Sequence, residues 1–216
     1  MIQLKLNSDA GRPLRILCLG AHSDDIEIGC GGTILRLAAE NPGCVFHWVV
    51  FSACGVRGAE ARRGAELFTK GATLEGPVAK EFRDGFLPFV GAEVKSVFEE
   101  LKSIGPDVVF TQYGKDAHQD HRLLSELTWN TFRNHLILEY EIPKYDGDRG
   151  RPSVFFPLDF ETCKTKVRHL LETFESQRVK PWFEESTFLS LMRLRGMECN
   201  SPSGYAEAFY CRKLVL

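Results

Sequence analysis

Three short apolar runs, each followed by a helix-like segment, constrain the fold more than any other feature of the sequence. They span residues 15–20, 45–52 and 107–111. The second run, V-F-H-W-V-V-F-S, is apolar almost throughout, which is typical of a strand that is buried on both faces. Strands that alternate with helices at this spacing form right-handed β-α-β units. The sequence therefore predicts a three-layer α/β/α fold with a mostly parallel sheet.

The remaining predicted elements continue this alternation. Apolar periodicity predicts helices at residues 32–40, 59–70, 92–103, 120–134, 161–174 and 184–196. Short apolar runs predict strands at residues 79–82 and 136–141, and an edge strand at residues 208–216. The polar, Gly- and Pro-rich stretch at residues 145–152 is predicted to be a surface loop. The segment after it is too short to build its own core, so we expect a single domain over residues 1–216.

Composition narrows the classes of function. The 216 residues carry a formal net charge of −2 and contain no Lys/Arg-rich block, which argues against nucleic acid and anionic membranes as partners. No apolar run approaches the length of a membrane span, and residues 1–15 lack the apolar core of a signal peptide. The seven cysteines are odd in number and include no C-x-x-C, as expected of reduced thiols. We therefore expect a cytoplasmic protein.

A polar motif follows the first apolar run. Residues 19–33 read L-G-A-H-S-D-D-I-E-I-G-C-G-G-T and contain His22, Asp24 and Asp25. A turn between a strand and a helix is where an α/β protein places its chemistry. A phosphate-binding turn would present backbone N–H groups, whereas two adjacent carboxylates repel phosphate and attract a cation. The motif therefore indicates a metal site, and the glycines are interpreted as packing residues.

A second polar motif follows the run at residues 107–111. It reads Q-Y-G-K-D-A-H-Q-D-H-R and contains His118, Asp120 and His121. In a doubly wound sheet the first strand is central, and the strand that starts the second half lies beside it. The loops that leave these two strands point in opposite directions and open a crevice. We therefore expect both motifs to line one crevice.

Two imidazoles and one carboxylate form a three-ligand site with an open position, which is the pattern of catalytic zinc. His22, Asp25 and His121 are the predicted metal ligands. Zinc lowers the pKa of a bound water and polarises a carbonyl group. Neighbouring residues in a tight turn point in different directions, so Asp24 is predicted to act as general base on the zinc-bound water.

The two other polar residues of the second motif are assigned supporting catalytic roles. His118 is predicted to stabilise an oxyanion or to protonate a leaving amine. Asp120 is predicted to orient an imidazole ligand.

These motifs resemble those of the PIG-L/LmbE-like N-deacetylase family. The family signatures A-H-P-D-D-x-x-x-G-x-G-G-T and H-x-D-H correspond to residues 21–33 and 118–121. Shorter matches follow in the family order, namely R-x-x-E at residues 57–60, D-G at 84–85, S-Q at 176–177 and Y-A-E-x-F at 205–209. The chain departs from the pattern at Ser23 and Gln119, where the family usually has proline. It also has Asp116 in place of a tyrosine that is often found just before the second histidine motif, with Tyr113 nearby.

The resemblance implies a Rossmann-like fold and the zinc-dependent removal of an acetyl group from the 2-amino position of a GlcNAc-type sugar or conjugate. It implies the same ligands, base and His118 role as above, and sugar contacts by Arg57 and Asp84. The implied partner is a small amino-sugar substrate. Members of the family are mostly cytoplasmic, are often oligomeric, which allows a homo-oligomer here, and use zinc or in some cases iron.

Other interpretations compete with this one. Taken alone, the acidic pair could complement a helix dipole, and the second motif could be exposed to solvent. Their joint occurrence after two strands favours the metal site. The glycine-rich turn alone would suit a nucleotide-sugar-binding α/β protein without hydrolytic activity. A zinc-dependent O-acetyl esterase would use the same polarised water as the deacetylase.

Overall fold

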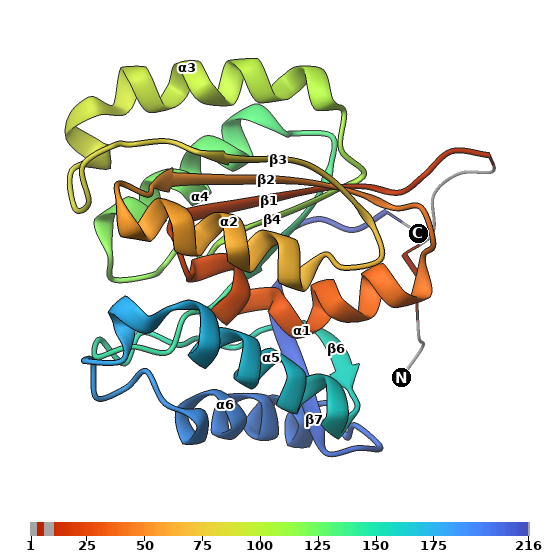
Figure 1. Ribbon diagram of the computed structural model, residues 1–216. Helices are drawn as coiled ribbons and strands as arrows, with labels where there is room; N and C mark the ends of the chain where they lie inside the picture. Colours follow the sequence, from red (N-terminus) through yellow and green to blue (C-terminus); the bar gives the residue numbers. More distant parts are fainter. Residues whose placement is uncertain (1–3, 7–10, 216) are drawn as a thin grey trace.

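The computed structural model describes residues 4–6 and 11–215 of the chain. A seven-stranded sheet in the order β3-β2-β1-β4-β5-β7-β6 runs through the described part (Figure 1). Its strands are β1 (Arg15–His22), β2 (Val45–Ser52), β3 (Thr73–Ala79), β4 (Val108–Gln112), β5 (Leu136–Tyr140), β6 (Val154–Leu158) and β7 (Tyr205–Tyr210). The first five strands pair in parallel, and β7 pairs antiparallel with β5 and β6. The predicted α/β fold with a mostly parallel sheet is confirmed.

The first strand is central, as predicted. It pairs with β2 on one side and with β4 on the other. Because parallel strands end at the same edge of a sheet, the loops after β1 and β4 begin side by side. This topology brings together the two polar motifs.

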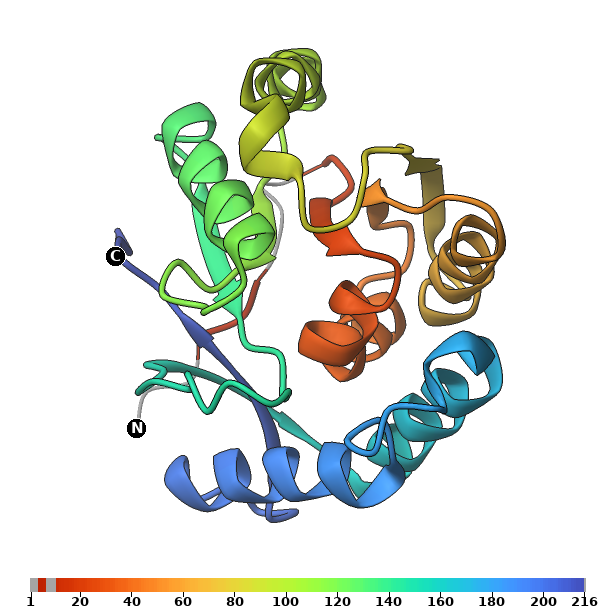
Figure 2. The same cartoon turned by 90° about the vertical axis from the view of Figure 1, so that its left-hand side faces the viewer.

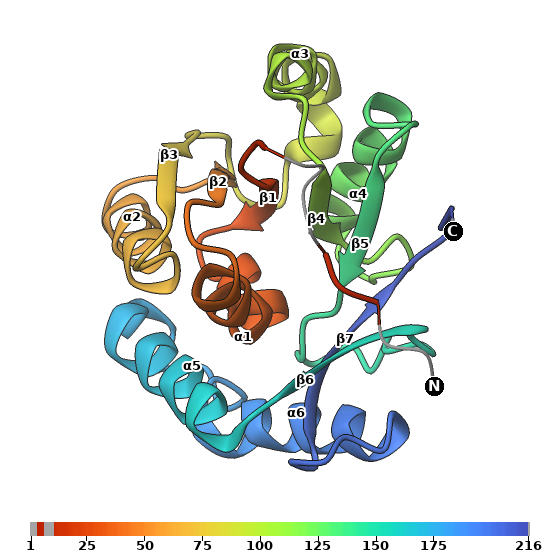
Figure 3. The ribbon, with the colours of Figure 1, turned by 90° about the vertical axis from the view of Figure 1, so that its right-hand side faces the viewer.

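Helices cover both faces of the sheet. They are α1 (Asp25–Glu40), α2 (Val56–Phe68), α3 (Gly91–Leu101), α4 (Gln119–Thr131), α5 (Phe160–Thr173) and α6 (Glu185–Glu198). Figures 2 and 3 show α3 and α4 on one face and α1, α2 and α5 on the other, while α6 packs on β7 and α5. None of the described helices is long and apolar enough to cross a membrane.

Alternate side chains of the central strands enter two separate cores. In β1, Ile16 and Cys18 pack toward the α1 side, whereas Leu17 and Leu19 pack toward the α3 side. All four side chains are fully buried. The apolar runs in the sequence are therefore continuous because both faces of each central strand are covered.

Helix α1 begins earlier than the sequence pattern predicts. The expected start was residue 32, but the helix starts at Asp25 and continues through the glycines, with a kink at Cys30 (φ −141°). After the kink, the backbone N–H groups of Gly32 and Thr33 donate to the buried carboxylate of Glu207 at 2.8 and 2.6 Å. Lys166 pairs with the same carboxylate at 2.6 Å. The cap therefore comes from β7, which local sequence patterns do not reveal.

The glycines of the first motif allow close packing, as predicted. A Cβ atom on Gly29 would lie 2.1 Å from the Tyr140 ring, and one on Gly31 would lie 2.5 Å from Phe68. Both contacts are shorter than any side chain tolerates without movement. The glycines thus let α1 approach the sheet and α2.

We expect the substitution Gly29→Ala to lower the free energy of unfolding by about 1–3 kcal/mol, because overpacking forces buried groups apart. Tyr140 cannot yield easily, since its hydroxyl donates to the Leu19 carbonyl at 2.6 Å within the core. Urea denaturation measures the effect. Gly91→Ala is the matched control, because a Cβ there meets no atom within 4 Å. Equal stability of the two variants would contradict the packing role.

Two strand predictions in the less regular parts of the chain are wrong. The strand expected at residues 79–82 is instead β3, which pairs with β2 from Thr73 and leaves only an isolated bridge at Glu81. The strand expected at the edge is β7, which lies between β5 and β6 and ends at Tyr210; residue 216 of that prediction lies outside the described residues. The edge position belongs to β6, which the sequence pattern missed because it directly follows the polar loop.

Candidate metal centre

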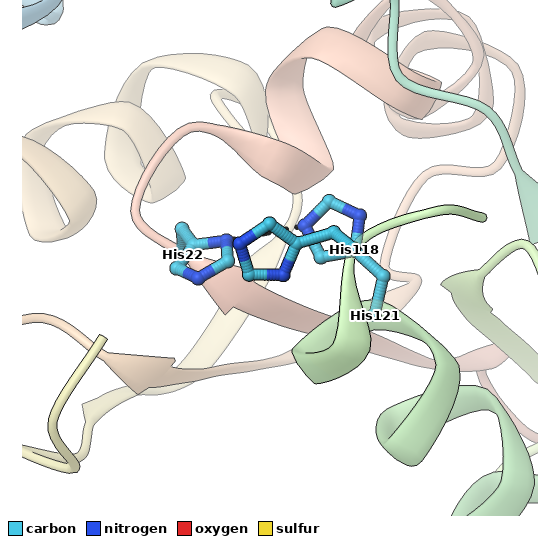
Figure 4. A group of neighbouring side chains, drawn as sticks. All are labelled: His22, His118 and His121. Atoms are coloured by element: carbon cyan, nitrogen blue, oxygen red, sulfur yellow. Dashed lines mark hydrogen bonds between the residues drawn. The ribbon is translucent and has the colours of Figure 1, made fainter. Parts of the chain in front are cut away.

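Both polar motifs meet at the carboxyl ends of β1 and β4. His22 is the last residue of β1, and His118 caps α4, which also carries His121. The centroids of the three imidazole rings lie 4.8–5.1 Å apart (Figure 4). Residues separated by 99 positions in the chain are therefore in contact, because β1 and β4 are neighbours. The predicted meeting of the two motifs is confirmed.

The three predicted ligands present one atom each to a common point. His22 Nδ1 lies 3.1 Å from His121 Nε2 and 3.3 Å from Asp25 Oδ2, and the last two atoms are 3.4 Å apart. Ligands that bind zinc tetrahedrally at about 2.0 Å are separated by about 3.3 Å. The side chains of Asp25 and His121 are nearly buried, and that of His22 is 15% exposed. This donor set therefore fits a zinc-sized ion without rearrangement.

Neighbouring donors form two further groupings around His22. His118 lies with His22 and His121 in one group, and with His22, Asp84 and Asp120 in another. Asp84 Oδ1 is 3.0 Å from His22 Nε2, although the Asp84 side chain is 76% exposed. His118 can therefore share a cation with His22 and His121, and the third ligand can be Asp25 or His118.

The electrostatics of the site favour a cation. Burial opposes the charged form of His22, but Asp25 and two further carboxylates outweigh it and raise the pKa of His22 well above its ordinary value. Burial also opposes ionisation of Asp25, yet the imidazoles of His121 and His22 hold its pKa far below the usual range. A divalent ion would supply the positive charge that a proton on His22 supplies otherwise.

A residue that the sequence analysis missed supports Asp25. The side-chain amide of Gln112 donates to Asp25 Oδ2 at 2.7 Å, and the backbone N–H of His22 donates to the same oxygen at 2.7 Å. Gln112 is the last residue of β4 and is fully buried. A polar residue at the end of an otherwise apolar strand was the available signal.

Asp120 is buried beside His22 and binds the turn that contains Gly85. Its carboxylate accepts hydrogen bonds from the backbone N–H groups of Gly85 at 2.8 Å and Leu87 at 3.1 Å. One of its oxygens is 3.4 Å from His22 Nε2. The Asp120 carboxylate therefore pairs with the imidazole of His22.

Asp116 is the carboxylate that contacts the Nδ1 atom of His121. Its Oδ2 atom lies 3.0 Å from His121 Nδ1, and its side chain is 3% exposed. Burial opposes ionisation, but contacts with His121, the His118 N–H and Lys144 lower the pKa of Asp116 below its usual value. The sequence analysis noted Asp116 only as a departure from the family pattern.

The predicted base and one predicted substrate contact touch each other. The guanidinium of Arg57 donates to Asp24 Oδ1 at 2.6 Å. Arg57 is itself held by Glu60 at 3.1 Å and Ser176 Oγ at 3.2 Å. Ser176 in turn donates to both oxygens of Glu60. The short R-x-x-E and S-Q segments of the sequence therefore form one network that fixes Arg57 against Asp24.

Comparison with known proteins identifies the family. The model of the PIG-L family, described as GlcNAc-PI de-N-acetylase, matches residues 17–132, a segment that contains both polar motifs and most of the sheet. The chain belongs to the PIG-L family. An uncharacterized deacetylase of this kind, YaiS from Escherichia coli K12, is 29% identical over 153 residues, covering 64% of this chain and 79% of the relative.

Solved structures share the fold of this PIG-L member. The N,N'-diacetylchitobiose deacetylase of Pyrococcus horikoshii superposes with a TM-score of 0.69 at 19% identity, covering 91% of this chain and 83% of that one. GalB, the 4-carboxy-2-hydroxymuconate hydratase of Pseudomonas putida KT2440, superposes with a TM-score of 0.74 at 17% identity, covering 94% and 98%. Because the same fold carries a hydratase, the fold alone does not fix the reaction.

Proposed function

We propose that the protein is a zinc-dependent hydrolase that removes the acetyl group from an N-acetylated, GlcNAc-type amino sugar or sugar conjugate. The observation that carries this proposal is the triangle of His22 Nδ1, Asp25 Oδ2 and His121 Nε2, with edges of 3.1–3.4 Å. Membership of the PIG-L family supports a deacetylase. The fold relative that is named for diacetylchitobiose supports an acetylated amino sugar as the substrate class.

His22, Asp25 and His121 would hold the ion. When bound, zinc polarises the substrate carbonyl and makes a coordinated water more acidic. Asp24 adjoins this triad in sequence and is 5% exposed, so it can accept the proton of the attacking water within a largely dehydrated site. The Arg57 guanidinium at 2.6 Å fixes the Asp24 carboxylate in one orientation. Asp24 can then return the proton to the amine as the C–N bond breaks, which yields acetate and the free amino sugar.

His118 is suited to stabilise the oxyanion. Its Nδ1 atom accepts a hydrogen bond from the backbone N–H of Asp120 at 3.2 Å, so the neutral ring carries its proton on Nε2. Burial, with the neighbouring imidazoles, lowers the pKa of His118. The ring is therefore neutral at neutral pH and acts as an Nε2–H donor. This favours oxyanion stabilisation over proton donation, the two roles that the sequence left open.

Arg57 and Asp84 are the proposed sugar contacts. The Arg57 side chain is 24% exposed and that of Asp84 is 76% exposed, so both are open to a ligand. Arg57 lies in α2 and contacts Asp24, whereas Asp84 lies in the turn before α3 and contacts His22. A sugar hydroxyl group between them would find a donor on one side and an acceptor on the other.

Acetate release from matched sugars tests the proposal. Zinc-loaded protein is incubated with N-acetylglucosamine, diacetylchitobiose, N-acetylglucosamine conjugates, and the corresponding O-acetyl sugars, and acetate and free amine are both measured. We expect equal amounts of acetate and amine from at least one N-acetyl substrate. Release from O-acetyl sugars alone would indicate an esterase. Tight binding of a nucleotide sugar by chelator-treated protein, without turnover, would indicate the non-hydrolytic alternative.

A further inference from the structure

We propose that Asp116 and Lys144 are positioning residues that set the orientation of His121, so that the loop at residues 144–150 forms part of the metal centre. This inference rests on the proposed role of His121 as a ligand. It also gives a role in the metal centre to the polar stretch at residues 145–152, which was predicted to be a surface loop.

The Asp116 carboxylate is fixed on both of its oxygens. Oδ2 lies 3.0 Å from His121 Nδ1, and Oδ1 accepts the backbone N–H of His118 at 2.7 Å. His121 presents its other nitrogen, Nε2, to His22 and Asp25. A carboxylate that accepts the N–H of an imidazole holds the ring in the tautomer and rotation that the metal requires. The 3.0 Å contact between Asp116 Oδ2 and His121 Nδ1 places Asp116 where it can perform this function for His121.

Lys144 pairs with the same Asp116 oxygen that faces His121. Its Nζ atom is 3.0 Å from Asp116 Oδ2 and 2.7 Å from Asp148 Oδ2, and the side chain is only 11% exposed. Asp148 Oδ2 also accepts the backbone N–H of Ala117 at 2.6 Å. A buried carboxylate needs such compensation, because an unpaired charge in the interior is costly. The lysine therefore joins the loop to the segment that precedes His118.

Each imidazole ligand thus has its own carboxylate. Asp120 lies near His22 Nε2 at 3.4 Å, and Asp116 lies near His121 Nδ1 at 3.0 Å. The sequence motif predicted only Asp120 as the residue that orients an imidazole. In the structure this role is shared, because Asp116, in the segment before α4, lies against His121.

Metal affinity tests this inference without any sugar substrate. Zinc dissociation constants are measured by competition with a chromophoric chelator, and the visible spectrum of the cobalt(II) form reports ligand geometry. We expect Asp116→Ala to weaken zinc binding by about 10- to 100-fold. Asp116→Asn should lose less, because its amide oxygen still accepts the His121 N–H. Lys144→Met should weaken binding in the same direction and change the cobalt spectrum, and Lys144→Arg should restore part of the affinity.

Controls separate positioning from general loss of structure. Arg36→Met also removes a cation from an ion pair, the one with Glu40 at 2.8 Å near the C-terminal end of α1, and it should leave metal affinity unchanged. Thermal melting of each metal-free variant, followed by circular dichroism, verifies folding. If Asp116→Ala and Lys144→Met bind zinc as tightly as the wild type, the inference is overturned while the proposed function stands. If the wild type binds zinc and the variants weaken it, but no N-acetyl sugar is hydrolysed, the inference stands and the proposed function fails.

Discussion

Replacing Asp24 by asparagine is expected to lower kcat by about 10²- to 10⁴-fold, with the metal content unchanged. An amide has nearly the same size as a carboxylate but cannot take a proton from water. Its oxygen can still accept the hydrogen bond that Arg57 donates to Asp24 at 2.6 Å, so the local geometry should persist. The loss should therefore appear in turnover rather than in folding or metal retention.

Steady-state acetate release and elemental analysis of the same preparation measure the two quantities. Asp107→Asn is a matched control, because Asp107 also accepts from an arginine, Arg12 at 2.8 Å, but stands at the opposite end of β4. That variant should retain wild-type turnover. Full activity of Asp24→Asn would show that another group accepts the proton.

The substitution His121→Ala is expected to abolish stable metal binding. It removes Nε2, which lies 3.1 Å from His22 Nδ1 and 3.4 Å from Asp25 Oδ2, and so leaves two of three donors. Dialysed wild-type protein should contain about one zinc per chain and the variant close to none. His169→Ala is the control, because His169 packs against Phe68 at 5.5 Å, outside the predicted metal centre. Zinc retention by His121→Ala would refute the ligand assignment.

The same measurement distinguishes the two candidates for the third ligand. Both Asp25 and His118 lie close to the other two donors. If Asp25 is the ligand, Asp25→Asn should release the metal, while His118→Ala should retain it and lose turnover. The reverse result would assign His118 to the metal and leave the oxyanion without this donor.

Much of the fold could be predicted from the sequence because it depends on local patterns. The continuous apolar runs marked β1, β2 and β4 since these strands are covered on both faces. Once β1 was assigned to the centre of the sheet, the topology of parallel strands brought the two motifs together. His22, Asp25 and His121, whose residue types and spacing indicated a metal site, meet at the ends of β1 and β4.

The parts that escaped prediction depend on partners far away in the sequence. The start of α1 was misplaced because its second half is capped by Glu207, which belongs to β7. Asp116 was not recognised as a support for His121 because its countercharge, Lys144, lies 28 positions further along. Gln112 was placed at the start of the second polar motif and was not recognised as a partner of Asp25. No periodicity or motif marks such contacts.

The capping of α1 by Glu207 has a consequence for the order of assembly. A fragment that ended at residue 132 would contain every proposed ligand and the whole segment that matches the family model, but it would lack the Glu207 carboxylate that accepts hydrogen bonds from α1. During synthesis, the contacts of Gly32 and Thr33 with Glu207 can form only after residue 207 has emerged and β7 has inserted between β5 and β6. The final shape of α1 is therefore expected late in folding, when β7 joins the sheet.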